Sequence, residues 1–307
     1  MAPVVSVLVN TYQRPKKIQD CLNAILKSSF SQLEIIVIEQ RGSSQLREFI
    51  KKIDKTKIRY FNLKKIGASK AKNFGIKKSK GEILAFTDDD CIIDRYWLKN
   101  IYESFKKNQN IIGIFGKVLP YQPHLHRGKI CPCTFLSNKK KTINRICFHW
   151  KNIGFGNNMA FRKEIFEKMD GFKEWLGPGS IGSNAEDAEF ALRLLSKGYK
   201  ILYNPEIKVY HNRWLTKEEF RKQCLSYSCG EVACYGFLAF KGNKLGKKVI
   251  KNNFLDSWGK LKFSLKSILF FKKRGFRLFY YTLQEFYFRL RGLLVSFWFA
   301  KVARASK

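Results

Sequence analysis

Residues 81–97 read GEILAFTDDDCIIDRYW and are the clearest guide to the fold of this chain. Residues 82–87 form a nearly continuous apolar run, which is typical of a strand buried on both faces in a parallel sheet. Three carboxylates follow that run, Asp88, Asp89 and Asp90. Adjacent acids repel one another, so a divalent cation is the partner that would stabilise them best. The acids are therefore expected to hold a metal-chelated phosphate group, with a solvated acidic turn as the alternative that this stretch alone leaves open.

The residues on both sides of this stretch alternate between strand-like and helix-like patterns. Strands are predicted at 4–9, 34–38, 58–61, 111–118, 200–203 and 208–210, and helices at 15–26, 46–53, 67–78, 97–105 and 163–169. Residues 120–150 show no periodicity and are interpreted as a variable loop or lid. Strands that alternate with helices in this way build an α/β fold with a mostly parallel sheet of the nucleotide-binding kind.

Polar residues follow three of the predicted strands. The first strand is followed by Thr11, Tyr12 and Arg14, the second by Glu39, and the fourth by the three acids. In a parallel sheet these strand ends converge on one edge, where the first two loops could hold a base and ribose. The chain has no G-x-G-x-x-G after its first strand and no P-loop motif, so a dinucleotide-binding fold and a P-loop enzyme are not indicated.

The second half of the sheet region carries further candidate site residues. The glycines around Asn157 and Asn158 suggest a backbone that comes close to a ligand, although they could serve only tight turns. Residues 183–186 have the S-x-x-E form of a capping box, which predicts Ser183 as the N-cap and commits Glu186 to the backbone. Asp187 is then the freer carboxylate, either a catalytic group or a solvated partner of the helix dipole. His211 follows a strand and could join a metal, although a lone histidine is more often structural.

The composition sets the class of partner. The formal net charge is +35 and 45% of the 307 residues are hydrophobic, so the chain is globular and its partner is expected to be polyanionic. No signal peptide is visible, which predicts a cytoplasmic protein with reduced cysteines. A zinc site could be assembled from Cys131, Cys133, Cys147 and His149, but their one-residue gaps do not match the usual spacing.

The composition changes near residue 215, so a catalytic domain is predicted at 1–215 and a basic, aromatic-rich helical region at 216–307. From residue 241 onward, seventeen Lys and Arg stand against only Asp256 and Glu285. One helical face there carries apolar side chains: Phe279, Leu283, Phe286, Leu290, Leu294 and Phe297. This pattern favours a helix that lies on an anionic membrane, which predicts a peripheral protein on the inner face of the cell membrane. Charges within residues 278–300 argue against a membrane span, and a helix packed on another protein surface is the alternative.

Five stretches of the chain, taken in order, resemble a known family. They are SVLVNTYQRPKKIQDCLNAIL at 6–26, LEIIVIEQRGS at 33–43, GASKAKNFGIKKSKGEILAFTDDDCIIDRYWL at 67–98, GNNMAFRKEIFEKMDGF at 156–172 and NAEDAEFALRLLSKGYKILYNPEIKVYH at 184–211. In sequence and spacing these stretches are similar to family 2 glycosyltransferases with the GT-A fold.

The resemblance implies roles for individual residues. Nucleotide-sugar binding would fall to Thr11, Tyr12, Arg14, Glu39, Lys72, Asp88 and Asp89. Metal binding would fall to Asp90, with Asp88 and His211 beside it. The Glu-Asp motif places the catalytic base at Asp187 with Glu186 next to it, and Asn157 and Asn158 would lie on the acceptor side. Lys72 stands where arginine is common, and Glu39, Gln40 and Arg41 stand where many members have two acids, which leaves the donor base open.

The implied activity is transfer of a sugar from a UDP-, GDP- or dTDP-sugar, with Mn²⁺ or Mg²⁺, to a saccharide or lipid-linked acceptor in cell-surface polysaccharide assembly. The chemistry requires one base that deprotonates the acceptor hydroxyl during an inverting displacement. A sugar nucleotidyltransferase of related fold is one alternative, although VNTYQRP lacks the glycine-rich signature such enzymes carry. A non-catalytic membrane-binding or nucleic-acid-binding protein is the other, but no nucleic-acid module is recognisable and no nucleic acid is expected as a partner.

Overall fold

The computed structural model describes residues 3–53, 56–146 and 152–305. The chain divides into two compact units. One, here called the sheet unit, consists of Met1–Glu174 and Phe190–Lys217. The other, the helical unit, consists of Trp175–Glu189 and Glu218–Lys307. The assignment of catalysis to residues 1–215 and of a separate role to 216–307 stays a prediction.

The sheet unit is built on one nine-stranded mixed sheet with the order β3-β2-β1-β4-β8-β6-β9-β5, and β7 pairs with β9. The parallel strands are β1 (Val5–Tyr12), β2 (Leu33–Gln40), β3 (Ile58–Leu63), β4 (Ile83–Asp88), β6 (Ile111–Pro120) and β9 (Lys200–His211). The antiparallel strands are β5 (Cys91–Ile93), β7 (Lys141–Ile143) and β8 (Met159–Arg162). The predicted α/β fold with a mostly parallel central sheet is confirmed.

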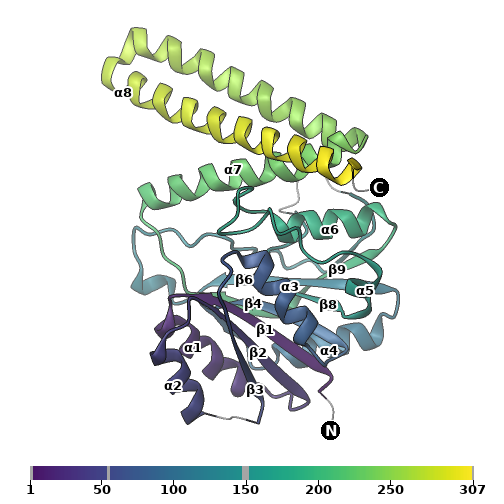
Figure 1. Cartoon of the computed structure of the whole chain (residues 1–307). Helices are drawn as coiled ribbons and strands as arrows, with labels where there is room; N and C mark the ends of the chain where they lie inside the picture. The colour runs from purple at the N-terminus through teal and green to yellow at the C-terminus, as the bar shows by residue number, and fades with distance from the viewer. Residues whose placement is uncertain (1–2, 54–55, 147–151, 306–307) are drawn as a thin grey trace. The chain divides into compact units, whose positions relative to one another are not determined.

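Helices cover both faces of this sheet (Figure 1). One face packs against α1 (Pro15–Leu26), α2 (Ser44–Lys52) and α4 (Trp97–Lys107), whose apolar residues share a buried cluster with the alternate residues of β1, β2 and β4. The other face receives α3 (Ala68–Lys78), where a methyl group on Gly75 would lie only 2.8 Å from Leu8 and 2.9 Å from Ile38. The short helices η1 (Pro123–Leu125) and α5 (Glu164–Lys168) also belong to the sheet unit, whereas α6 (Glu186–Ser196) is divided between the two units at Phe190.

Three strands were not predicted from the sequence, and two strands that were predicted separately form a single strand in the structure. β5, β7 and β8 have only three or four residues each, too few to show a period. The strands predicted at 200–203 and 208–210 are both part of β9, whose pairing with β6 jumps from Gly116↔Asn204 to Lys117↔Lys208. This irregularity interrupts the hydrophobic alternation, so the sequence pattern suggests a break where the strand continues.

The helical unit contains α7 (Lys217–Phe240), which begins at the last residue of the sheet unit, and α8 (Lys244–Ala305). Figure 1 shows that α8 doubles back on itself as two antiparallel arms. Arg289 on the second arm is buried and binds the first arm, through Asp256 at 3.1 Å, the Ser257 hydroxyl at 2.6 Å and the Asn253 carbonyl. It also pairs with Glu285 at 2.6 Å, and Glu285 in turn accepts from Lys260 on the first arm. An ionic network therefore joins the two arms.

The apolar face predicted for this region is only partly correct. Leu283, Leu290, Leu294 and Phe297 are exposed, but Phe286 packs edge-on against Phe254 of the first arm. The helix therefore uses one side to pack within the helical unit and leaves a second apolar stripe exposed. Among the described residues, no helix has the length and apolar character needed to cross a bilayer.

Candidate active site

The acids after β4 lie beside the loop after β1, because β1 and β4 are neighbouring parallel strands with Asn10 opposite Asp88. The Thr11 hydroxyl donates to Asp89 Oδ2 at 2.6 Å. Arg14 Nη1 donates to Asp89 Oδ1 and to Asp90 Oδ2, both at 3.1 Å. The predicted convergence of the first loop and the acids is therefore found, and Tyr12 stands next to it, 39% exposed.

His211 reaches the same group from the end of β9. Its Nε2 lies 3.2 Å from Asp90 Oδ1, and its Nδ1 lies 2.7 Å from the carbonyl oxygen of Pro132. Cys131 Sγ is 3.7 Å from the same Nδ1. Because each ring nitrogen faces an oxygen acceptor, the geometry suits a doubly protonated imidazolium. The segment predicted as a loop or lid thus supplies the group that fixes the orientation of His211.

Burial and charge set the protonation states of this cluster. For His211, burial lowers the pKa, but the hydrogen bond that its ring donates to Asp90 and the charge of that carboxylate outweigh burial and raise the pKa to about 10. For Asp90, burial raises the pKa, but the hydrogen bond and charge of His211, with Arg14, hold it below its usual value. Burial, together with the charge of Asp90, raises the pKa of Asp89 to about 6. Arg14 and His211 are thus positive partners of two of the three acids, Asp89 and Asp90.

A divalent cation fits this cluster on its donor set. Asp90, Cys91 and His211 offer one oxygen, one sulfur and one nitrogen within 4.8 Å of one another. Carboxylate oxygen suits Mn²⁺ and Mg²⁺, and imidazole nitrogen suits transition metals, so Asp90 with His211 favours Mn²⁺ over Mg²⁺. Asp88 was also predicted as a metal ligand, but among the described residues it does not belong to this cluster of Asp90, Cys91 and His211. The sequence analysis missed Cys91, although its position directly after Asp90 and its pairing with His211 in the β5–β9 register could have marked it.

The alternative zinc site has no support in the described part of the chain. Cys147 and His149 lie outside the described residues. Cys131 instead donates to the His211 carbonyl oxygen at 3.3 Å, which ties the loop to the end of β9.

Two predicted nucleotide-binding residues lie apart from this network. Glu39 is fully buried, and its two oxygens accept hydrogen bonds from Ser43 at 2.9 Å and from Tyr60 at 2.6 Å. It therefore holds the loop between β2 and α2, since Ser43 is also the N-cap of α2. Lys72 is buried on α3, with its ammonium group 5.5 Å from the ring centre of Phe172. Contacts of either residue with a nucleotide stay predictions.

The two adjacent asparagines differ sharply. Asn158 Nδ2 donates to the carbonyl oxygens of Lys117 and Ile207, at 2.8 and 2.9 Å, and its Oδ1 accepts from Trp97 Nε1 at 2.8 Å. With its side chain fully buried and saturated, Asn158 has a structural role at the β6–β9 irregularity, and its acceptor-side role stays a prediction. The buried amide of Asn157 finds no hydrogen-bond partner among the described residues, so its predicted role toward a ligand is still open.

This contrast predicts opposite effects on stability. Asn158→Ala should lower the free energy of unfolding by about 3 kcal/mol, because three buried groups lose their partner. Asn157→Ala should change it by less than about 1 kcal/mol, because no hydrogen bond to protein is lost. Urea denaturation of both variants measures the difference, and equal losses would contradict the assigned roles.

Glu186 and Asp187 lie in the first turn of α6, and both are buried. The predicted capping box is wrong. Helix α6 begins at Glu186, and Ala185, which the motif would place inside the helix, has a positive φ angle of 73° that a helix does not allow. Ser183 instead forms a hydrogen bond with Cys229 of α7. Asp187 Oδ1 accepts from the backbone N–H of Ala188 at 2.8 Å, so the Glu-Asp pair sits at the positive end of the helix dipole.

Comparison with known proteins gives a consistent result. The family model described as "Glycosyl transferase family 2" matches residues 6–170. "Glycosyltransferase AglE" of Haloferax volcanii is 35% identical over 72% of this chain and 71% of its own length. The "Glucosyl-dolichyl phosphate glucuronosyltransferase" of the same organism is 20% identical over 70% of this chain and 71% of its own.

A solved structure extends the similarity in fold to most of the chain. It is described as "Mannosyltransferase PcManGT from Pyrobaculum calidifontis in complex with GDP-Man and Mn2+". It superposes with a TM-score of 0.61 at 15% identity, and the match covers 94% of this chain and 88% of that one. At this identity the likeness concerns the fold.

Proposed function

This chain belongs to glycosyl transferase family 2 and is a sugar transferase, and on that premise we propose that it moves a sugar from a nucleoside diphosphate donor to a lipid-linked acceptor at a membrane surface. The observation that carries the proposal is the cluster of Arg14, Asp89, Asp90 and His211 at the ends of β1, β4 and β9. Cationic and anionic groups converge there at the sheet edge, where α/β proteins hold phosphorylated ligands.

Asp90 and His211 would hold the ion, which we propose to be Mn²⁺. When bound, the ion would neutralise charge that develops on the departing diphosphate. The side chain of Arg14 is 45% exposed and already reaches Asp89 and Asp90, so its guanidinium is placed to contact a phosphate oxygen beside them. The solved mannosyltransferase structure, which has the same fold and is in complex with GDP-Man and Mn²⁺, supports this kind of donor. UDP- and dTDP-sugars are alternative donors for this chain.

Asp187 is the proposed base. It would accept the proton of the acceptor hydroxyl while the oxygen attacks the anomeric carbon from the side opposite the diphosphate, which inverts that carbon. One carboxylate suffices because no covalent sugar intermediate is needed, in contrast to retaining glycosidases. Glu186, next to it in the same helical turn, is the alternative carboxylate.

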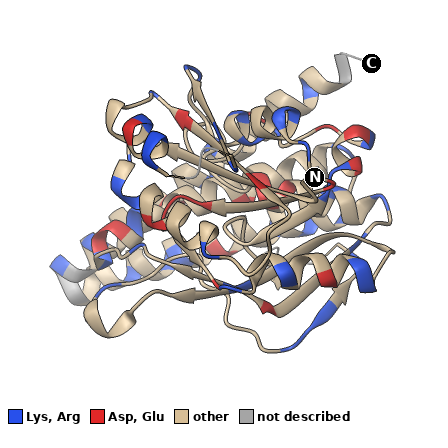
Figure 2. Cartoon of the chain, turned by 90° about the horizontal axis from the view of Figure 1, so that it is seen from below, with Lys and Arg blue, Asp and Glu red and all other residues tan. Residues whose placement is uncertain are grey.

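The lipid-linked acceptor is supported by a relative and by the helical unit. The relative from Haloferax volcanii is named for a dolichyl phosphate substrate. In α8 the side chains of Leu269, Phe270 and Phe276 are 80%, 79% and 61% exposed, with the exposed cations Lys266 and Arg277 nearby. Exposed aromatic residues among cations suit an anionic membrane surface. Figure 2 shows Lys and Arg distributed along many elements, as the net charge of +35 requires.

Metal binding should release a proton. In the metal-free protein His211 has a pKa of about 10 and is protonated at pH 7, whereas a metal requires the neutral imidazole. Mn²⁺ therefore competes with a proton, and its affinity should rise by about tenfold per pH unit between pH 6 and 8. Titration calorimetry in buffers of different ionisation enthalpy should give close to one proton released per Mn²⁺. Release of the same number by His211→Asn would show that the proton comes from another group.

The test of the proposed function is thermal unfolding with a panel of nucleoside diphosphates and sugar nucleotides, each with Mn²⁺ and with chelator. A ligand that binds only the folded state at 100 times its Kd stabilises that state by about 2.7 kcal/mol. A metal-dependent rise in Tm for one nucleotide would identify the donor base. Absence of a rise with every member of the panel would overturn the proposal.

A further inference from the structure

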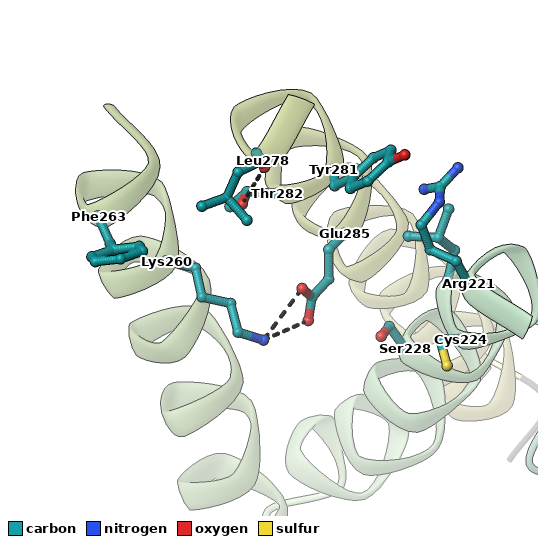
Figure 3. A pocket seen from close by; sticks show the side chains of 10 residues that line it. Arg221, Cys224, Ser228, Lys260, Phe263, Leu278, Tyr281, Thr282 and Glu285 are labelled. Carbon is teal, nitrogen blue, oxygen red and sulfur yellow. Dashed lines mark hydrogen bonds and ion pairs between the residues drawn. The ribbon is translucent and has the colours of Figure 1, made fainter. Parts of the chain in front are cut away.

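The helical unit has an open cavity of about 380 Å³ between α7 and the two arms of α8 (Figure 3). Figure 3 shows Arg221, Cys224 and Ser228 of α7 on one side, Phe263 and Lys260 of the first arm on another, and the second arm behind them. Its volume lies within the range of about 300–1,000 Å³ that is usual for small-molecule sites. No residue of the candidate active site lines it.

The charged side chains in the walls of this cavity are already paired with protein groups. Lys260 Nζ lies 3.1 and 3.3 Å from the two oxygens of Glu285. Arg221 donates to Glu218 at 2.9 Å and to Gln284 at 2.7 Å, and its guanidinium lies 4.0 Å from the ring centre of Tyr281. The Thr282 hydroxyl donates to the carbonyl oxygen of Leu278 in its own helix. A ligand therefore gains little by hydrogen bonding to these groups, and the surface that remains to be covered is mainly apolar, with Leu225, Phe263 and Leu278 among its residues.

Two residues that line the cavity are themselves exposed and lie close to the tip of the α8 hairpin. Phe263 and Leu278 are 65% and 37% exposed, and each lies within two helical turns of exposed apolar side chains at the tip, Leu269 on the first arm and Phe276 on the second. Exposed Lys262 and Lys266 and Arg277 stand beside this path. A hydrocarbon chain could thus pass from the tip to the cavity over apolar side chains, with an attached anionic group left among cations at the entrance.

We infer that this cavity binds the isoprenoid chain of the acceptor lipid, with the phosphate at its entrance. The inference rests on the proposed function, which supplies the lipid-linked acceptor. A volume of about 380 Å³ suits one chain and not a helix, whose diameter with side chains is about 10–12 Å. Burial of apolar surface provides the affinity, at about 0.8 kcal/mol for each CH₂ group, and the exposed tip provides the route from the bilayer.

The test is photolabelling with a farnesyl phosphate analogue that carries a diazirine at the far end of its chain, presented in vesicles that contain phosphatidylglycerol. Mass spectrometry should locate the label on α7 and on both arms, within residues 221–228, 260–263 and 278–285. Excess farnesyl phosphate should abolish labelling, hexadecyl phosphate should compete at least about tenfold less well, and inorganic phosphate should not compete. Equal competition by hexadecyl phosphate would mean a general membrane-lipid site and overturn the inference, as would label confined to the exposed tip.

Two variants and a matched control make the test specific to the cavity. Ser228→Phe should fill the cavity from α7 and lower labelling at least tenfold. Asn252→Phe adds the same ring at an exposed position of α8 outside the cavity and should leave labelling unchanged. If Ser228→Phe does not fold, Leu278→Glu at the exposed entrance should have the same effect, because a carboxylate would have to be desolvated beside the chain. Full labelling of a folded Ser228→Phe or Leu278→Glu protein would overturn the inference.

The same samples separate this inference from the proposed function. Metal-dependent nucleotide stabilisation without label in the cavity would overturn the lipid site and leave the proposed transferase standing. Label in the cavity of a protein that no nucleotide stabilises would overturn the proposed function and leave a lipid-binding site.

Discussion

Asp90→Asn is expected to abolish Mn²⁺-dependent nucleotide binding and to lower kcat/KM for sugar transfer by at least about a thousandfold. The substitution removes a charge from the donor set that Asp90 shares with His211, and it removes the anion that Arg14 contacts 3.1 Å away. Calorimetric titration with Mn²⁺ and the best nucleotide, followed by initial rates of transfer, measures both effects.

Asp20→Asn is the matched control, because it makes the same chemical change on the exposed side of α1 in the same unit. It should bind nucleotide and transfer sugar as the native chain does. An Asp90→Asn protein that keeps its nucleotide affinity in the presence of chelator and of metal alike would remove Asp90 from the metal site.

Asp187→Asn should lower kcat by roughly a thousandfold while nucleotide affinity stays within about twofold of that of the native chain. A general base acts on the acceptor hydroxyl in the transition state, so its loss affects the chemical step and not donor binding. Initial rates at saturating donor give kcat, and the thermal-shift panel gives nucleotide binding.

Glu186→Gln decides which of the two neighbouring carboxylates is the base. A small effect of Glu186→Gln beside a large effect of Asp187→Asn supports Asp187, and the reverse pattern would transfer the role to Glu186. Glu164→Gln serves as control, since Glu164 is an exposed acid in the first turn of another helix, α5. It should leave kcat unchanged.

The central fold could be predicted because its strands are apolar runs and its helices have an apolar face. Nearly all residues of β1, β2 and β4 are buried, so these strands are continuous apolar runs in the sequence. A strand with one face in solvent would instead alternate apolar and polar residues. The convergence of Thr11, Arg14 and the acids followed from topology alone, because neighbouring parallel strands end at the same edge.

The other features of the site could not be predicted, because they depend on contacts between residues that are far apart in the sequence. That His211 neutralises Asp90 depends on β9 pairing with β5, which lies more than a hundred residues earlier in the chain. Asn158 resembles Asn157 in sequence, yet only the irregular β6–β9 pairing gives it three partners. The capping box failed at Ser183 because Ala185 adopts a left-handed φ, so the helix starts two residues later than the motif suggests.

The position of Arg289 has a consequence for how this protein can vary among its relatives. Its ionic network holds Asn253, Asp256 and Glu285 in fixed register. Beyond that network, toward the tip, the buried Ser264 and Thr282 bond only to carbonyls of their own helix, so neither hydroxyl requires a particular partner across the interface. The hairpin can therefore gain or lose matched helical turns at its tip without disturbing its base. Among relatives, insertions and deletions in α8 should accumulate near residues 265–278. They would change the length of the hairpin and keep the ionic network around Arg289.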